Sequence, residues 1–170
     1  MRLNNGLAHP PASFVPLWGT AGTFGGGQDG SAAVLLASPE AVGRYNLNPL
    51  ARILARTVIG SDPVLMLDAP ILATKKVLGM ANLTLADMDV IEINEAFASV
   101  VLAWAKEVKP DMARVNPNGG AIAHGHPVGA TGVILMTKLV YELQRRKAKY
   151  GLQTMCIGHG MTTAAIIERI

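Results

Sequence analysis

The chain has 170 residues, enough to bury a hydrophobic core without help from a disulfide or a metal ion. Half of its residues are hydrophobic and 16% are charged, which excludes disorder over most of the length. The net charge of +3 and an aromatic content of 5% argue against a nucleic-acid-binding track and suit a small anionic ligand.

The predicted elements are short strands and helices that follow one another along the chain. Residues 1–30 are expected to be irregular, because prolines and then glycines interrupt them. Apolar runs, cap residues and periodicity predict strands over 31–37, 51–60, 89–93, 152–157 and 161–167, and helices over 39–45, 70–80, 95–108 and 128–147. Strands that alternate with helices and then end in a strand pair indicate an α/β fold with a mixed sheet.

The sequence contains one cysteine, Cys156, so no disulfide can form within the chain. This suits a reducing compartment, and the first residues lack the pattern of a signal peptide. No apolar run is long enough to span a bilayer. We therefore expect a cytoplasmic location, with neither membrane nor nucleic acid as a partner.

The glycine-rich stretch 116–132 contains the sequence Gly-His-Pro at 125–127. Glycines permit tight turns and close approach of a ligand. Pro127 favours the first turn of the following helix, which predicts His126 at or just before its N-cap. There the helix dipole would lower the pKa of His126 and leave a neutral imidazole able to act as a general base. A merely capping histidine is an equally weighted alternative.

Two further segments contain polar groups that could act on a substrate. Cys156 ends an apolar strand before the turn Gly158-His159-Gly160, whose backbone N–H groups could face an oxyanion. Asn94 begins Asn-Glu-Ala-Phe, where it either caps the next helix together with Glu95 or orients a water or substrate oxygen. A buried structural cysteine and a helix cap are the simpler alternatives.

A metal site built from histidines and the cysteine is a minor hypothesis. The four candidate ligands are His124, His126, His159 and Cys156. Their spacing does not match a standard zinc site, and no acidic residue that could support one lies beside them. We therefore predict no metal.

Three segments, in this order, resemble signatures of the thiolase family, the CoA-dependent acyltransferases that make or split 3-ketoacyl-CoA. INEAFA resembles the family's NEAF segment, NGGAIAHGHPVGATG its glycine-rich GHP signature, and CIGHGMTTA its C-terminal CxGGGxG signature. GTAGTFGGGQDGSAAVLL is similar to the stretch of the family that runs through TAGN and DGAAA. The resemblance covers the chain from about Gly19 onward. It implies a thiolase-like C-terminal domain, with helices packed on both faces of a mixed sheet.

The resemblance also implies a role for each matching catalytic residue. His126 would activate the acyl-accepting cysteine and help to bind the thioester oxygen. Cys156 would be the second catalytic cysteine, which handles the α-proton. Asn94 would hold the water of one oxyanion hole, and the backbone N–H of Gly158 would serve the other.

Further implications concern the substrate and its tunnel. Phe97 and the loop 20–27, including Ala21 and Gly25, would line the pantetheine tunnel. Coenzyme A thioesters would be the substrates, with no bound cofactor.

The sequence departs from the family pattern at several positions. The family's nucleophilic cysteine lies in its N-terminal half, and this sequence has no cysteine other than Cys156. Gly25 stands where the family usually has a serine, and His124 replaces an aliphatic residue. His159 and Thr162 replace glycines of the last signature, and His159 would bring a side chain near Cys156.

These departures lead to our expectation for the whole chain. Residues 1–40 would be a remnant of the N-terminal domain and residues 41–170 the C-terminal domain. Such a half would be inactive until a nucleophile-bearing N-terminal half or thiolase subunit complements it, so we expect a homo- or hetero-oligomer. The alternative is a non-catalytic remnant that binds acyl-CoA or associates with a thiolase subunit.

Overall fold

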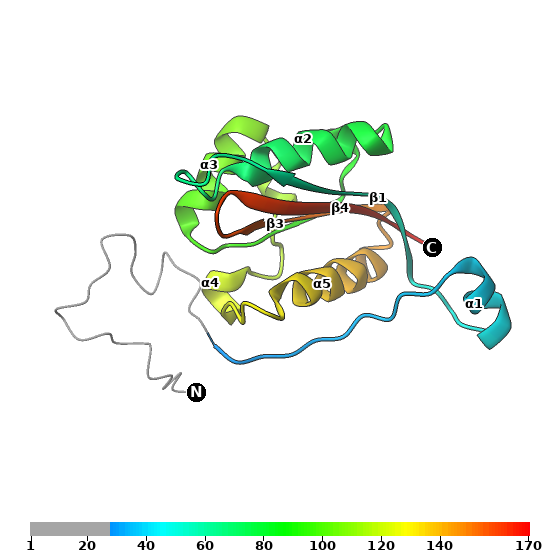
Figure 1. The fold of residues 1–170 in the computed structure, drawn as a ribbon. Coiled ribbons are helices and arrows are strands. Elements are labelled where there is room, and N and C mark those ends of the chain that lie inside the picture. The colour runs from blue at the N-terminus through cyan, green and yellow to red at the C-terminus, as the bar shows by residue number, and fades with distance from the viewer. Residues whose placement is uncertain (1–27) are drawn as a thin grey trace.

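The computed structural model describes residues 28–170, which form a four-stranded sheet with helices on both sides (Figure 1). The helices are α1 (Pro39–Tyr45), α2 (Ala69–Ala81), α3 (Ala98–Val108), α4 (Ala121–His124) and α5 (Thr131–Arg146). The strands are β1 (Ala51–Gly60), β2 (Val90–Ile93), β3 (Tyr150–Ile157) and β4 (Met161–Arg169). Two 3₁₀ turns, η2 (Leu85–Asp87) and η3 (Met112–Arg114), flank β2 and α3.

The sheet is mixed, with the strand order β1-β4-β3-β2. β1 pairs antiparallel with β4, β4 antiparallel with β3, and β3 parallel with β2. The crossover from β2 to β3 contains α3, α4 and α5. The α/β class and the mixed sheet predicted from the sequence are therefore confirmed.

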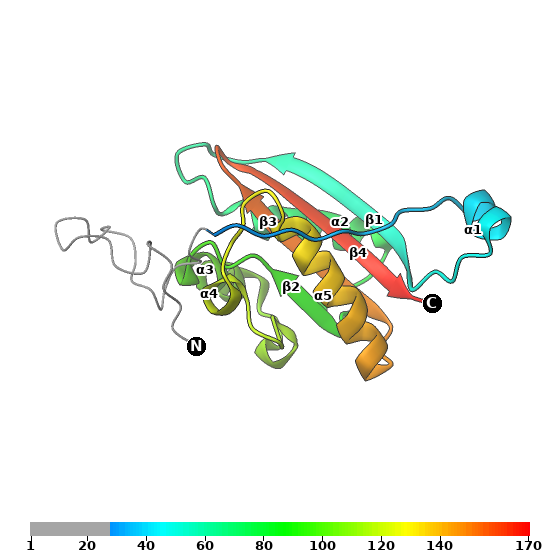
Figure 2. The ribbon, with the colours of Figure 1, turned by 90° about the horizontal axis from the view of Figure 1, so that it is seen from below.

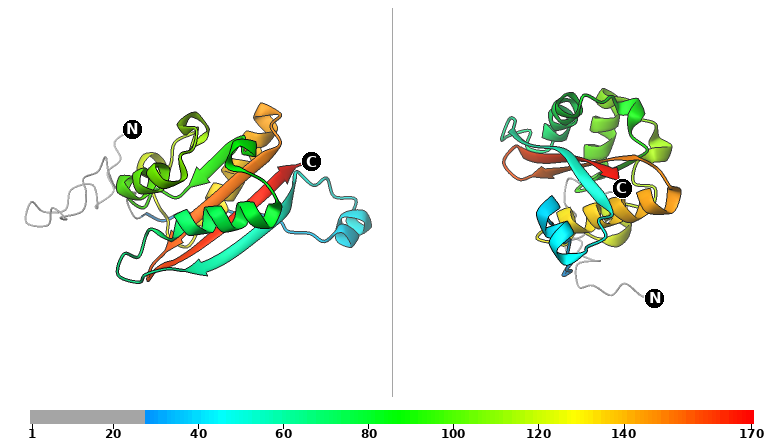
Figure 3. Two further views of the ribbon diagram at one scale, coloured as in Figure 1. Left: turned by 90° about the horizontal axis from the view of Figure 1, so that it is seen from above. Right: turned by 90° about the vertical axis from the view of Figure 1, so that its right-hand side faces the viewer.

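The helices pack on opposite faces of this sheet (Figures 1 and 3). On one face, α2 and α3 cover a core that contains Trp104, Met88 and Ile91, each at most 1% exposed. On the other face, α5 lies over β2 and β3 and buries a smaller group of side chains that includes Leu139 and Leu143. No helix within residues 28–170 has the length and apolarity needed to cross a bilayer.

Most of the predicted elements occur where the sequence places them, but the strand predicted at 31–37 does not form. Residues 28–38 run as an extended chain along the outer side of α5, without strand pairing (Figure 2). Their side chains are exposed, including Leu35 at 80% and Leu36 at 72%. The apolar run predicts a strand, but a strand also needs a neighbour to pair with, and this segment has none among the described residues.

The helices α3 and α5 begin later than predicted, and both differences affect the candidate site. α3 begins at Ala98 with Phe97 as its N-cap, so the predicted cap of Asn94 and Glu95 is wrong. The backbone N–H of Asn94 instead extends the β2–β3 pairing by donating to the Thr154 carbonyl, over 3.1 Å. α5 begins only at Thr131, so His126 is not at its N-cap.

Candidate active site

The three predicted catalytic side chains meet at one edge of the sheet. β2 and β3 are parallel, so the residues that follow them lie at the same edge. Here Asn94 follows β2, while Cys156 lies near the end of β3. A cavity of about 240 Å³ opens at this edge, lined by Leu67, Ala96, His126, Val128, Met155, Cys156, Ile157 and Gly158.

His126 reaches the cavity from the loop between α4 and α5, and its ring is held by Thr131. The Thr131 hydroxyl donates to the Pro127 carbonyl over 2.8 Å, so its oxygen accepts from Nδ1 of His126 over 2.6 Å. This pattern assigns the proton to Nδ1 and leaves a lone pair on Nε2. His126 is therefore arranged to accept a proton at Nε2.

The pKa of His126 is lowered, but not by a helix N-terminus. Burial of the imidazole is the main cause, and the neighbouring His124 adds to it. The predicted direction of the shift is confirmed and the predicted cause is wrong. The imidazole is neutral at pH 7, as a general base requires.

Asn94 connects the histidine with the cysteine. Its side chain is 1% exposed, and Nδ2 lies 3.4 Å from Nε2 of His126. A hydrogen bond from Asn94 also acts on Cys156, where it favours the thiolate. Oδ1 of Asn94 is buried and has no hydrogen-bond partner among residues 28–170. A buried, unpaired acceptor of this kind suits a site that a water or ligand fills.

Cys156 is 6% exposed, and burial raises the pKa of its thiol despite the contribution of Asn94. At neutral pH the residue is therefore a thiol rather than a thiolate. Such a group is a poor spontaneous nucleophile, but it can give up a proton and take it back. The geometry thus fits acid/base work better than nucleophilic attack.

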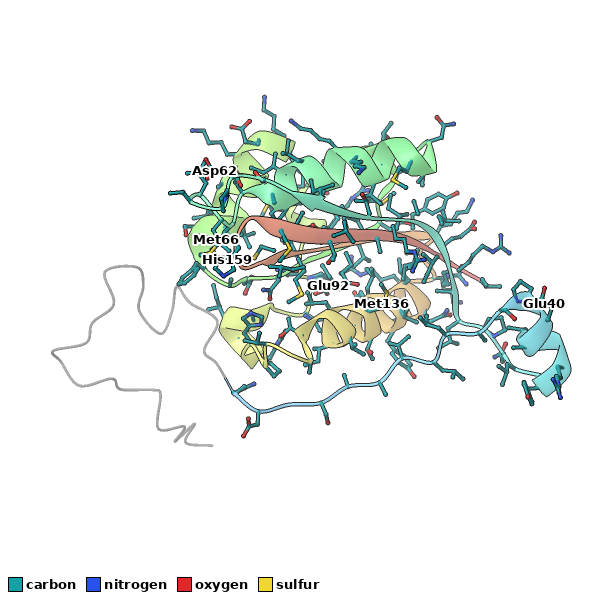
Figure 4. The ribbon with its side chains drawn as sticks, in the orientation of Figure 1. Glu40, Asp62, Met66, Glu92, Met136 and His159 are labelled. Atoms are coloured by element: carbon teal, nitrogen blue, oxygen red, sulfur yellow. The ribbon has the colours of Figure 1, made fainter. Side chains whose placement is uncertain are left out.

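The turn after Cys156 is tight, and two of its residues, His159 and Gly160, have positive φ. Gly158 lines the cavity and is exposed. His159 adopts the left-handed backbone conformation with φ of 63° and points its side chain into solvent. Gly160 has φ of 80°, and a Cβ there would lie 2.7 Å from the Ser61 carbonyl oxygen. Figure 4 shows His159 at the same end of the sheet as Met66 and Asp62.

Sequence reasoning missed the residues that hold the loop of His126 in place. Thr131 binds the histidine directly, and Glu95 accepts from Asn116 Nδ2 over 3.1 Å and from the Ile122 backbone N–H over 3.0 Å. Gly120 permits this contact, since a Cβ there would lie 2.2 Å from the Glu95 carboxyl carbon. These partners are distant in sequence, so no local pattern reveals them.

The remaining predicted site residues lie elsewhere. Phe97 is half-buried at the start of α3 and is not among the residues that line the cavity. Ala21 and Gly25 lie outside the described residues. No three His, Cys, Asp or Glu side chains of residues 28–170 are arranged to hold a metal ion.

The chain is similar to known proteins over most of its length. Residues 47–169 match the family model described as "Thiolase, C-terminal domain". The chain is 55% identical to a steroid 3-ketoacyl-CoA thiolase of Mycobacterium tuberculosis, with 84% of this chain and 35% of that protein covered. It is 53% identical to a β-ketoadipyl-CoA thiolase of Acinetobacter baylyi, with 89% and 38% covered.

Solved structures agree with these relatives. The crystal structure of human mitochondrial 3-ketoacyl-CoA thiolase superposes with a TM-score of 0.86 at 45% identity, covering 88% of this chain and 38% of that one. The chain therefore spans little more than a third of the length of the relatives that it matches.

Proposed function

Because this chain belongs to the thiolase family and carries its C-terminal domain, we propose that it is one half of a thiolase-type acyltransferase. It would supply His126 as the base and Cys156 as the acid/base for formation or thiolysis of 3-ketoacyl-CoA. The single observation that carries this proposal is that Asn94 reaches both His126 and Cys156, and that these two residues line one cavity. Coenzyme A thioesters are the proposed substrates, and the chain's own chemistry needs no further cofactor.

The protonation states of the site suit each proposed role. Nε2 of His126 would take the proton of a partner's cysteine, whose thiolate then attacks the acyl carbon and releases CoA. The protonated Nε2 could next donate to the thioester oxygen. Cys156 would give its proton to the departing CoA thiolate. Its own thiolate would then take the α-proton of a second acyl-CoA, and the resulting enolate carbon would attack the acyl group on the partner's cysteine. The Gly158 N–H and a water on Asn94 would stabilise the developing oxyanions.

The partner proposed here is a nucleophile-bearing N-terminal thiolase half. This sequence has no second cysteine, and it spans about 35–38% of the relatives' length. Its exposed apolar segment 31–37 and an open part of the sheet beside α5 are surfaces that such a half could cover. The open part forms a cavity of about 450 Å³, lined in part by Arg56, Val58 and Thr163.

The boundary near residue 40 and a cytoplasmic location belong to the same proposal. Residues 28–40 are exposed in the described structure, as expected of a segment that packs on another domain. A free catalytic thiol at Cys156 requires a reducing compartment, which the cytoplasm provides.

The test is an assay of acetoacetyl-CoA thiolysis. We expect no turnover by the purified chain, and turnover when it is mixed with the N-terminal portion of a relative such as the Acinetobacter baylyi protein. Cys156→Ala should abolish the activity of the mixture. The matched control Leu102→Ala, at a 65% exposed position on α3, should leave it unchanged.

Two results would count against this proposal. Thiolysis by the isolated chain that survives Cys156→Ala would exclude it directly. A folded chain that gives no activity in any mixture would favour the alternative, a non-catalytic remnant that binds acyl-CoA or a thiolase subunit.

A further inference from the structure

A second polar cluster lies beside the loop that carries His126, on the α5 face of the sheet. Its centre is the ammonium group of Lys138, on α5. Nζ of Lys138 donates to Oε2 of Glu92 over 3.0 Å, to the Gly119 carbonyl over 2.5 Å, and to Nε2 of His124 over 3.4 Å. An ammonium has three protons, so each of them has an acceptor. Figure 4 shows Glu92 between the sheet and α5.

The cluster is well removed from water. The side chain of Glu92 is fully buried and that of Lys138 is 19% exposed. Burial raises the pKa of Glu92 to about 7, although Lys138 opposes this shift. An ion pair in such a place adds little net stability, because desolvation offsets most of the attraction. The role of the ion pair is therefore better explained by the segments that it holds in place.

His124 can take part only as a neutral imidazole. Its Nδ1 lies 3.0 Å from the Gly125 carbonyl and donates to it, which leaves the lone pair of Nε2 directed at Lys138. Burial and Lys138 both lower the pKa of His124, whereas Glu95 raises it. Lys138 from α5, Glu95 from the segment after β2, and His126 from its own loop are the titratable groups that act on it or respond to it.

The contacts of Lys138 fix both ends of one short segment. Gly119 precedes α4 and His124 ends it, and Lys138 joins both ends to β2 through Glu92. His126 follows two residues after His124. The position of the His126 imidazole relative to β2 and Asn94 therefore depends on these contacts of Lys138.

We propose that Lys138 is a positioning residue for His126, acting through the acceptors His124 and Gly119. The contacts of Lys138 with His124 and Gly119 hold the His126 ring at the place where Thr131 fixes its tautomer and Asn94 reaches Nε2. The consequence for catalysis rests on the function proposed above, whereas the positioning itself can be measured without any activity.

The test is the ¹⁵N spectrum of the histidine rings, which reports the tautomer of His126, recorded on the full chain at pH 8. We expect the Nδ1–H tautomer in the wild-type chain and a mixture of tautomers in Lys138→Met. The control Lys76→Met removes an exposed lysine from α2 and should leave the tautomer unchanged. A folded Lys138→Met chain that keeps the Nδ1–H tautomer would overturn the proposal.

Two further comparisons separate positioning from charge and from folding. His124→Gln retains a neutral acceptor for Lys138 and should preserve the tautomer, whereas His124→Leu, of the same charge, should not. The double variant Glu92→Gln/Lys138→Met also removes the buried carboxylate, so that no unpaired charge is left in the interior. It replaces Lys138→Met in the test if that single variant does not fold. It should also give a mixture of tautomers, and a single tautomer there would count equally against the proposal.

Activity in the complemented mixture gives an independent readout. Lys138→Met should lower kcat about tenfold or more with little change in KM, because the base is displaced while substrate contacts remain. Inactivity of every mixture, the wild type included, would refute the proposed function alone. The tautomer measurement would still decide the present inference.

Discussion

The two faces of the sheet differ in how far this chain completes them. Under α2 and α3 the sheet has a continuous apolar core, closed by Trp104, whose indole Nε1 donates to Thr74 over 2.9 Å. On the opposite face α5 covers β2 and β3 and leaves much of β1 and β4 open, as at Val58, which is 68% exposed (Figure 2). The first face is closed by residues of this chain. The second is where we place the partner and where Lys138 joins the segment before His126 to β2.

The largest expected effect tests the face of the sheet that α2 and α3 cover. Trp104→Ala should lower the free energy of unfolding by about 3–5 kcal/mol, because it removes a fully buried ring and leaves Thr74 without its donor. Val58→Ala, on the open face, should change it by no more than about 0.5 kcal/mol. Denaturant unfolding measures both. Equal costs at the two positions would remove the contrast between the faces.

The next effect concerns pH, because Glu92 lies buried between the sheet and α5 (Figure 4) and its pKa is raised. The pKa of Glu92 is 4.5 when unfolded and about 7 when folded. Between these values the folded chain binds more protons. The stability associated with protonated Glu92 is thus fully present below pH 4.5 and is lost as the pH rises through 7. The loss is on the order of 3 kcal/mol.

Glu92→Gln should abolish this part of the pH dependence. Its stability relative to the wild-type chain should rise steadily between pH 4.5 and 7. Glu107→Gln, an exposed site on α3, is the control and should follow the wild-type curve. The same curve for Glu92→Gln and the wild type would mean that Glu92 does not titrate as described.

The smallest effect lies in the hairpin that joins β3 and β4. A left-handed backbone costs a residue with a Cβ about 1–2 kcal/mol, so His159→Gly should relieve strain. Glycine's greater freedom in the unfolded chain offsets part of this, leaving a gain below about 1 kcal/mol. His159→Ala keeps the Cβ and should give no gain. Thermal unfolding would show the difference. A lower stability of His159→Gly would contradict the expected relief of strain, because the exposed side chain makes no hydrogen bond or ion pair within residues 28–170 whose loss could explain it.

The sequence predicted the parts of this molecule that depend on local patterns. Apolar runs and periodicity placed α1, α2, most of α3 and α5 and the four strands of the sheet, but not α4 in the glycine-rich stretch. Three motifs singled out Asn94, His126 and Cys156 as candidates. Parallel pairing of β2 and β3 then brings these residues together, which a sequence alone does not show.

The errors have a common physical origin in contacts between distant segments. Asn94 pairs with β3 rather than capping α3, and α5 begins at Thr131 rather than at Pro127. The run 31–37 has strand-like composition but no neighbouring strand in the part of the chain that the structure describes. Lys138 looks like an ordinary helical lysine until the fold places Glu92 and His124 around it.

The central claim is that the N-terminal half of a thiolase covers the open face and the segment 31–37. Hydrogen–deuterium exchange of this chain, with and without the N-terminal portion of the Acinetobacter baylyi relative, tests it most directly. We expect new amide protection in residues 31–37 and along β1, with α2 and α3 unchanged. Protection confined to α2 and α3, or no protection anywhere in a mixture that contains both chains folded, would contradict the account.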